Sequence, residues 1–94
     1  MRKYEIIYIV KTTVDDERKT EILEEAKGII ETAGTVTEVE EMGKRRLAYE
    51  IKKNNEGFYT VISYEAEVSV NPILKKKFKL NEDVIRDLIV RVDK

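Results

Sequence analysis

The chain has 94 residues, 41% of them hydrophobic, and a formal net charge of −1. This length is enough for one domain with a modest core and too short for two, so we expect a single domain over residues 1–94. Neither cysteine nor histidine is present, which removes disulfides, thiolate nucleophiles, the commonest general base and the commonest transition-metal ligands. Composition therefore argues against most hydrolase, redox and zinc mechanisms, and we expect neither enzymatic activity nor a cofactor.

Charge is unevenly distributed along the chain. Residues 12–41 carry ten acidic and three basic residues, net −7, and the other residues carry nine acidic and fifteen basic, net +6. The net charge of the whole chain does not suggest attraction to a polyanion, but the positive net charge outside residues 12–41 does. No window is apolar enough to span a membrane, and the lack of cysteine suits a reducing cytoplasm. We expect an intracellular, cytoplasmic protein without a membrane partner.

Two elements are expected in the first third of the chain. Residues 4–10 are mostly β-branched and aromatic, which is typical of a central strand covered on both faces. Residues 13–16 fit a helix capping box, and Gly34 fits a C-terminal stop. Between them, apolar residues recur at the spacing of one helical face, at Ile22, Leu23, Ala26, Ile29, Ile30 and Ala33. The spacing predicts an amphipathic helix that follows the strand.

A hairpin is expected next. Residues 35–52 are strand-like, with Leu47, Tyr49 and Ile51 alternating, whereas Val36 and Val39 are out of phase with each other. A bulge or bend before Arg45 would explain this slip. Residues 53–57 form a polar connector that contains glycine, and residues 58–66 resume the strand pattern. The two strands are therefore predicted to pair.

The last part of the chain predicts a helix and a strand. Asn71 and Pro72 suit a helix start, with Ile73, Leu74 and Phe78 on its buried side, and residues 84–92 read as a strand. The order β-α-β-β-α-β, with right-handed crossovers, places both helices on one face of a four-stranded antiparallel sheet. The expected fold is an α+β, ferredoxin-like sandwich.

This architecture leaves one face of the sheet without helices. Alternation separates Tyr4, Ile6, Tyr8, Thr60, Ile62 and Tyr64 from Ile7, Ile9, Tyr59 and Val61. It does not decide which set faces the helices, but either choice leaves large apolar residues on the open face. We take the second set, Ile7, Ile9, Tyr59 and Val61, as the candidate partner interface. The alternative is a half-wet face covered by long neighbouring side chains.

Basic residues occur in clusters that could contact phosphate groups. They are Arg2-Lys3, Lys44-Arg45-Arg46, Lys52-Lys53, and Lys75-Lys76-Lys77 with Lys79. Arginine offers a planar fork for phosphate oxygens, so Arg45 and Arg46 are better candidates than the lysine run. Charge that protects an edge strand is the alternative for residues 44–46, and a solvated helix face is the alternative for residues 75–79.

Two other readings of this topology are weaker. Residues 57–61 faintly resemble the third strand of RNA-recognition motifs, but Thr60 and Ser63 stand where stacking aromatic residues belong. An acylphosphatase-like enzyme would need an arginine-containing phosphate loop after the first strand, and residues 11–14 provide neither that arginine nor a glycine-rich cradle. The acidic residues do not converge as a metal site requires.

One segment resembles a known family. GKRRLAYEIK, at residues 43–52, is similar to the signature of bacterial small-subunit ribosomal protein six, and the likeness extends to residues 1–5, 56–59 and 81–86. The resemblance implies a ferredoxin-like structural protein of the small ribosomal subunit. It further implies that the protein binds the central domain of small-subunit ribosomal RNA together with small-subunit ribosomal protein eighteen, and that it takes no small-molecule substrate.

The resemblance also ranks the basic residues. It makes Arg45 and Arg46 the leading RNA or partner contacts, followed by Arg2, Lys44 and Arg86. It assigns no role to the lysines of residues 75–77. The alternative function is a ferredoxin-like interaction or ligand-binding regulatory domain that does not bind RNA.

Overall fold

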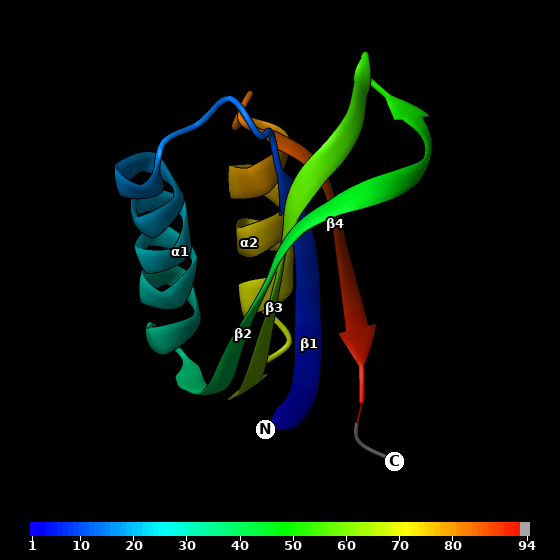
Figure 1. The fold of residues 1–94 in the computed structure, drawn as a ribbon. Helices are drawn as coiled ribbons and strands as arrows, with labels where there is room; N and C mark the ends of the chain where they lie inside the picture. Colours follow the sequence, from blue (N-terminus) through cyan, green and yellow to red (C-terminus); the bar gives the residue numbers. More distant parts are fainter. Residues whose placement is uncertain (93–94) are drawn as a thin grey trace.

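The computed structural model describes residues 1–92, which form one four-stranded sheet and two helices (Figure 1). In chain order the elements are β1 (Arg2–Val10), α1 (Asp16–Glu31), β2 (Gly34–Ile51), β3 (Asn54–Ala66), α2 (Val70–Lys79) and β4 (Val84–Arg91). The strands lie in the order β2-β3-β1-β4, and every neighbouring pair is antiparallel. The predicted ferredoxin-like fold is confirmed.

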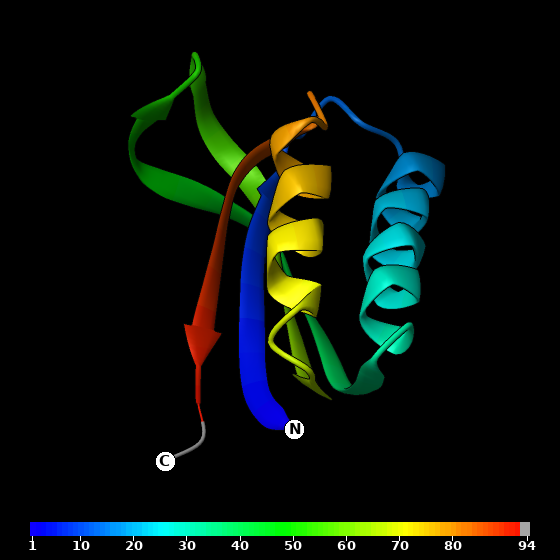
Figure 2. The same cartoon turned by 180° about the vertical axis from the view of Figure 1, so that it is seen from behind.

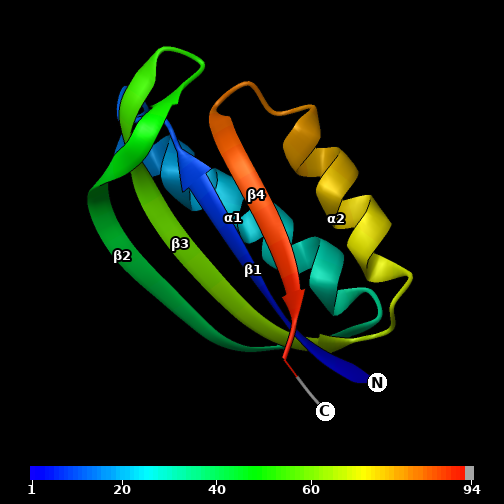
Figure 3. The same cartoon turned by 90° about the vertical axis from the view of Figure 1, so that its right-hand side faces the viewer.

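Strand alternation on β1 and β3 decides which face the helices cover. Tyr4, Ile6 and Tyr8 lie opposite Tyr64, Ile62 and Thr60, and all six are buried. They form the main core with apolar residues of both helices, and Tyr8 packs against Phe78 of α2 with 4.8 Å between ring centroids. Figure 3 looks onto the other side of the sheet, with α1 behind the strands. The open face therefore carries the alternate set of residues.

Helix α1 follows the predicted apolar stripe. Ile22, Ala26 and Ile30 are buried against the sheet, and Asp15 caps the helix by accepting a hydrogen bond from the backbone N–H of Arg18 at 2.8 Å. The expected stop at Gly34 is wrong, since the helix ends at Glu31 with Thr32 as its C-cap. Gly34 instead begins β2, where a Cβ would collide with Ala66 and with the carbonyl oxygen of Glu65. Close strand packing, not helix termination, requires this glycine.

Two bulges interrupt β2 before Arg45, as its sequence pattern predicts. The register against β3 shifts between Val36 and Glu38 and again between Glu41 and Gly43, so Thr37 and Met42 are the extra residues. Because of the first shift, Val36 and Val39 lie opposite Tyr64 and Ile62 and both pack against the helix-covered core. Bulges also bend a strand, and β2 curves strongly (Figure 1).

The connection between β2 and β3 is tighter than the sequence pattern predicts. Residues 53–57 are not a connector, because β3 already begins at Asn54, which pairs with Ile51. Lys52 and Lys53 make the turn, with positive φ angles of 51° and 66°. The Asn54 side chain donates to the carbonyl oxygens of Ile51 and Lys52 at 3.3 and 3.0 Å. The side chain of Asn54 thus stabilises the turn, while its backbone belongs to the strand.

Helix α2 packs on β1 and β4 through Val70, Leu74 and Phe78. The prediction that Ile73 is buried is wrong: its side chain is 55% exposed, because the buried stripe runs through Val70 instead. Among residues 1–92, the structure has no helix that is both long and apolar enough to cross a membrane.

Candidate partner and nucleic-acid interface

The distal part of the β2–β3 hairpin extends beyond the sheet and arches toward the open face, away from both helices (Figure 2). Between the pairs Arg46–Glu56 and Ile51–Asn54, β2 has four residues where β3 has one. This excess lets residues 47–50 bow outward and reach back over the sheet. Leu47 is buried there against Ile9 and Ile85.

Gly57 makes this packing possible at the base of the hairpin. A Cβ at this position would collide with the Cγ2 atom of Ile9 and approach the carbonyl oxygen of Val10 at 3.3 Å. Next to this contact is an apolar pocket of about 250 Å³, whose lining includes Ile7, Leu47, Tyr59 and Leu88. The hairpin therefore forms one wall of a shallow hollow on the open face.

A polar contact closes the outer rim of this hollow. Arg86, on β4, donates a hydrogen bond from Nη1 to the hydroxyl oxygen of Tyr49 at 2.7 Å. Tyr49 belongs to the bowed segment and is 63% exposed. The contact joins two segments that are 37 residues apart in sequence and ties the hairpin to the far edge strand of the sheet.

All four candidate interface residues lie on the open face. Ile7, Tyr59 and Val61 are half-buried, whereas Ile9 is only 6% exposed because the hairpin covers it. Two apolar residues of β4 on this face escaped the sequence interpretation: Leu88, which pairs with Ile7 and is 53% exposed, and Val90, which is 38% exposed. The alternation of Leu88 and Val90 with Asp87 and Ile89 in the sequence indicates that the two pairs lie on opposite faces of the sheet. Only the fold reveals which of the two pairs is exposed.

The structure does not bring the candidate RNA-binding residues together at one point. Lys44, Arg45 and Arg46 are exposed on β2, where successive side chains point to opposite sides of the hairpin. Arg45 lies opposite Gly57 and so shares its side with the open face, while Lys44 and Arg46 point the other way. Arg86 is held by Tyr49, and Arg2 begins β1 at the end of the sheet remote from the hairpin (Figure 1).

Ion pairs neutralise part of the basic charge of the molecule. Arg18 and Lys11 pair with Asp83, Lys75 with Asp87, and Lys77 with Glu25, so much of the basic charge on the body is neutralised locally. The cations of the hairpin are Lys44, Arg45, Arg46, Lys52 and Lys53. Within residues 1–92, none of these five forms an ion pair. Five cations without an ion pair are thus gathered on the hairpin, whereas others, such as Lys76 and Lys79, lie on the body.

The perturbed ionisable groups lie elsewhere. Burial raises the pKa of Tyr8 to about 12 against the opposing effect of a hydrogen bond with Thr60, and burial likewise raises the pKa of Tyr64 to about 12. A hydrogen bond to Asp83, followed by one to Glu21, raises the pKa of Arg18. Within the described residues no cluster of three or more potential metal ligands is found. The open face is apolar in its centre, and exposed cations lie along the hairpin.

Comparison with known proteins identifies the family. The family model described as ribosomal protein S6 matches residues 3–91. The chain belongs to the ribosomal protein S6 family. The small ribosomal subunit protein bS6 of Alkaliphilus oremlandii is 45% identical over 94 residues, covering all of both chains, and that of Desulforamulus reducens is 41% identical over 97% of both. The crystal structure of 30S ribosomal protein S6 from Thermotoga maritima superposes with a TM-score of 0.91 at 36% identity, covering 97% of this chain and 87% of that one.

Membership in the S6 family confirms the resemblance carried by residues 43–52. The protein is a structural constituent of the small ribosomal subunit in the cytoplasm, and it is not an enzyme. Residues 43–52, which carried the resemblance, include the part of β2 that extends into the projecting hairpin.

Proposed function

We propose that this S6-family protein binds the central domain of small-subunit ribosomal RNA jointly with small-subunit ribosomal protein eighteen. The observation that carries the proposal is the hairpin, whose unpaired cations stand beside an exposed apolar sheet face. Apolar surface of this kind on a small domain marks a protein contact, and unpaired arginines and lysines suit phosphate groups.

The two parts of the surface have separate tasks in this proposal. Protein eighteen covers the apolar side, at Ile7, Tyr59, Val61, Leu88 and Val90, while the hairpin contacts the RNA backbone. Ile9 supports this surface from below, since the hairpin already covers it. A net charge of −1 is compatible with RNA binding because residues 43–57, which include the projecting hairpin, carry a net charge of +3.

The proposal is tested by measuring binding to a central-domain RNA fragment, with and without protein eighteen, across a series of salt concentrations. We expect binding that is stronger with the partner present and falls steeply with salt, because each phosphate contact releases counterions. Arg45→Ala/Arg46→Ala should weaken binding and reduce the salt slope by about one unit for each phosphate that is no longer bound. Arg45 and Arg46 point to opposite sides of the hairpin. The single variants Arg45→Ala and Arg46→Ala therefore measure how much each side contributes to RNA binding.

A matched control removes the same charge from another surface. Lys76 and Lys79 are exposed on α2, and neither takes part in an ion pair within the described chain. Lys76→Ala/Lys79→Ala should therefore leave the salt slope close to that of the unmodified protein. Binding that is absent or insensitive to salt, even with the partner present, would contradict the proposal and favour an interaction domain that does not use RNA.

A further inference from the structure

The turn at the tip of the hairpin is built from residues that do not suit it. Lys52 and Lys53 are the two central residues between the paired residues Ile51 and Asn54, and both have left-handed backbone conformations. A two-residue hairpin loop of this type strongly favours Asn-Gly, because glycine adopts a positive φ without steric cost and asparagine tolerates it. Two consecutive lysines are strained there, since each Cβ crowds the backbone.

Local contacts explain how the turn is held but not why lysines occupy it. The Asn54 side chain bridges two carbonyl oxygens of the turn, and this support would serve Asn-Gly equally well. Within residues 1–92 neither lysine forms an ion pair, although six lysine or arginine side chains on the body of the molecule do. Strain that is retained without a local benefit points to a use outside the chain.

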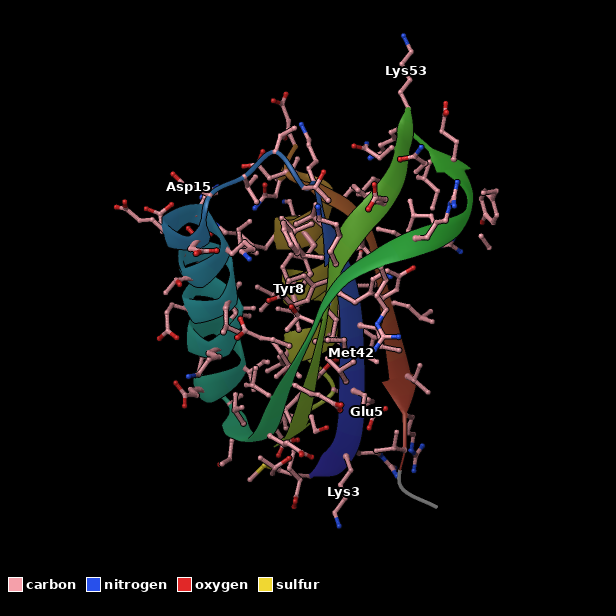
Figure 4. The ribbon with its side chains drawn as sticks, viewed as in Figure 1. Lys3, Glu5, Tyr8, Asp15, Met42 and Lys53 are labelled. Atoms are coloured by element: carbon pink, nitrogen blue, oxygen red, sulfur yellow. The ribbon has the colours of Figure 1, made fainter. Side chains whose placement is uncertain are left out.

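The position of the two lysines indicates what they contact. They stand at the apex of the projecting hairpin, with Lys53 pointing away from the body (Figure 4). Residues 43–57 carry five basic and two acidic residues, net +3, whereas the α1 side of the molecule is strongly acidic. Beside the turn is a recess of about 400 Å³ whose lining includes both lysines and also Lys11 and Glu82, which carry opposite charges. A polyanion that approaches the hairpin therefore meets positive charge first at its tip.

From these observations we infer that Lys52 and Lys53 form a phosphate-contacting site for the RNA backbone, separate from Arg45 and Arg46, and that backbone strain is retained in the turn to place them there. The inference rests on the proposed RNA-binding function and assigns that function a second site. It implies that stability and RNA affinity oppose each other at these two positions.

The test is the variant Lys52→Asn/Lys53→Gly, which installs the turn that the backbone favours. We expect its Tm to rise by several degrees, because the strain is relieved. In the presence of protein eighteen, its affinity for the central-domain RNA fragment should fall roughly ten-fold at about 0.1 M salt, and its salt slope should fall by about two units. Weaker binding by a more stable protein cannot be attributed to misfolding.

Two further variants make the result specific. Lys52→Arg/Lys53→Arg keeps the charge and should keep the salt slope, while Lys76→Ala/Lys79→Ala removes the same charge from α2 and should have little effect. Unchanged RNA binding by the Asn-Gly variant, or a decrease no larger than that of the α2 variant, would overturn the inference. An unchanged or lower Tm would overturn the role of strain. If the unmodified protein and its partner bind no RNA, the proposed function itself fails, which is a distinct outcome.

Discussion

At the scale of single residues, the glycine at the base of the hairpin is a steric requirement. Gly57 is buried, and a methyl group there would occupy the space of the Ile9 side chain. We expect Gly57→Ala to destabilise the fold by about 1–3 kcal/mol, because either Ile9 or the hairpin must shift. The measurement is urea unfolding followed by circular dichroism.

Gly28 provides a control, because substitution by alanine is expected to stabilise the protein there. It lies on the exposed side of α1, and no atom lies within 4 Å of the place that a methyl group would take. Gly28→Ala should stabilise the protein by about 0.5–1 kcal/mol, since alanine has a higher helix propensity. Equal effects at the two positions would contradict the steric role of Gly57.

Several errors of sequence interpretation also belong to this scale. Gly34 resembles a helix stop because glycine commonly follows helices, but here it is required by the close approach of Ala66 on the neighbouring strand. Ile73 resembles a core residue because it is large and apolar, yet Val70 takes the buried position on α2. Both errors arise because tertiary contacts, which the local pattern does not contain, decide the role of the residue.

At the scale of elements, the hairpin is an arm that two different contacts hold over the sheet. Leu47 packs against Ile9 and Ile85 from inside, and the hydrogen bond between Tyr49 and Arg86 holds the rim. Arg86, proposed as an RNA contact from sequence, therefore has a second task in positioning the hairpin. If Arg86 also binds a phosphate group, its guanidinium group must serve both that phosphate and the Tyr49 hydroxyl.

A double-mutant cycle measures this link. Tyr49→Phe removes only the hydroxyl group, and Arg86→Ala removes the donor. We expect the two changes to be coupled by about 0.5–1 kcal/mol in unfolding experiments, a modest value because the contact is exposed. Amide exchange in residues 47–57 should accelerate in both single variants and no further in the double variant. Additive effects would show that the hairpin is held by apolar packing alone.

Most elements were predictable because their patterns are local. The alternation of β1, the stripe of α1 and the phase slip of β2 each predicted the observed structure. The tip of the hairpin was not predictable, because Asn54, Asn55 and Gly57 form a typical turn composition whereas the actual turn uses two lysines in an unfavourable conformation. Sequence rules describe what is locally stable, and this turn departs from that optimum.

At the scale of the whole molecule, the sheet separates a face that the helices cover from an open face with exposed apolar residues. On the central strands β1 and β3, residues of the helix-covered face are almost all buried, whereas Leu88 and Val90 of β4 remain exposed on the open face. The sequence predicted that one face would be open but did not indicate which, since both alternate sets contain large apolar residues. The choice depends on the register of β1 against β3 and β4 and on the helix packing.

This division predicts that partner binding and stability can be changed independently. Leu88→Gln should weaken binding to protein eighteen at least roughly ten-fold, because a leucine buried in an interface contributes about 1.5–3 kcal/mol. The free energy of unfolding should change little, since Leu88 is already half exposed. Titration calorimetry measures the affinity. Ile73→Gln, at an equally exposed position on α2, should leave binding intact; a comparable decrease there would argue against the open face as the contact surface.

The bulges of β2 have a consequence for how the chain can vary. Thr37 and Met42 each add one residue to β2 without a counterpart on β3, so the paired residues before and after each bulge keep the alternation that places Arg45 opposite Gly57. Deleting either bulge residue would remove a local bend and leave the other side chains of β2 on their present sides, whereas inserting a residue into a paired segment would exchange the two sides for the residues that follow. The bulges are therefore the positions at which β2 can lose a residue without changing which of its side chains face the sheet's open side.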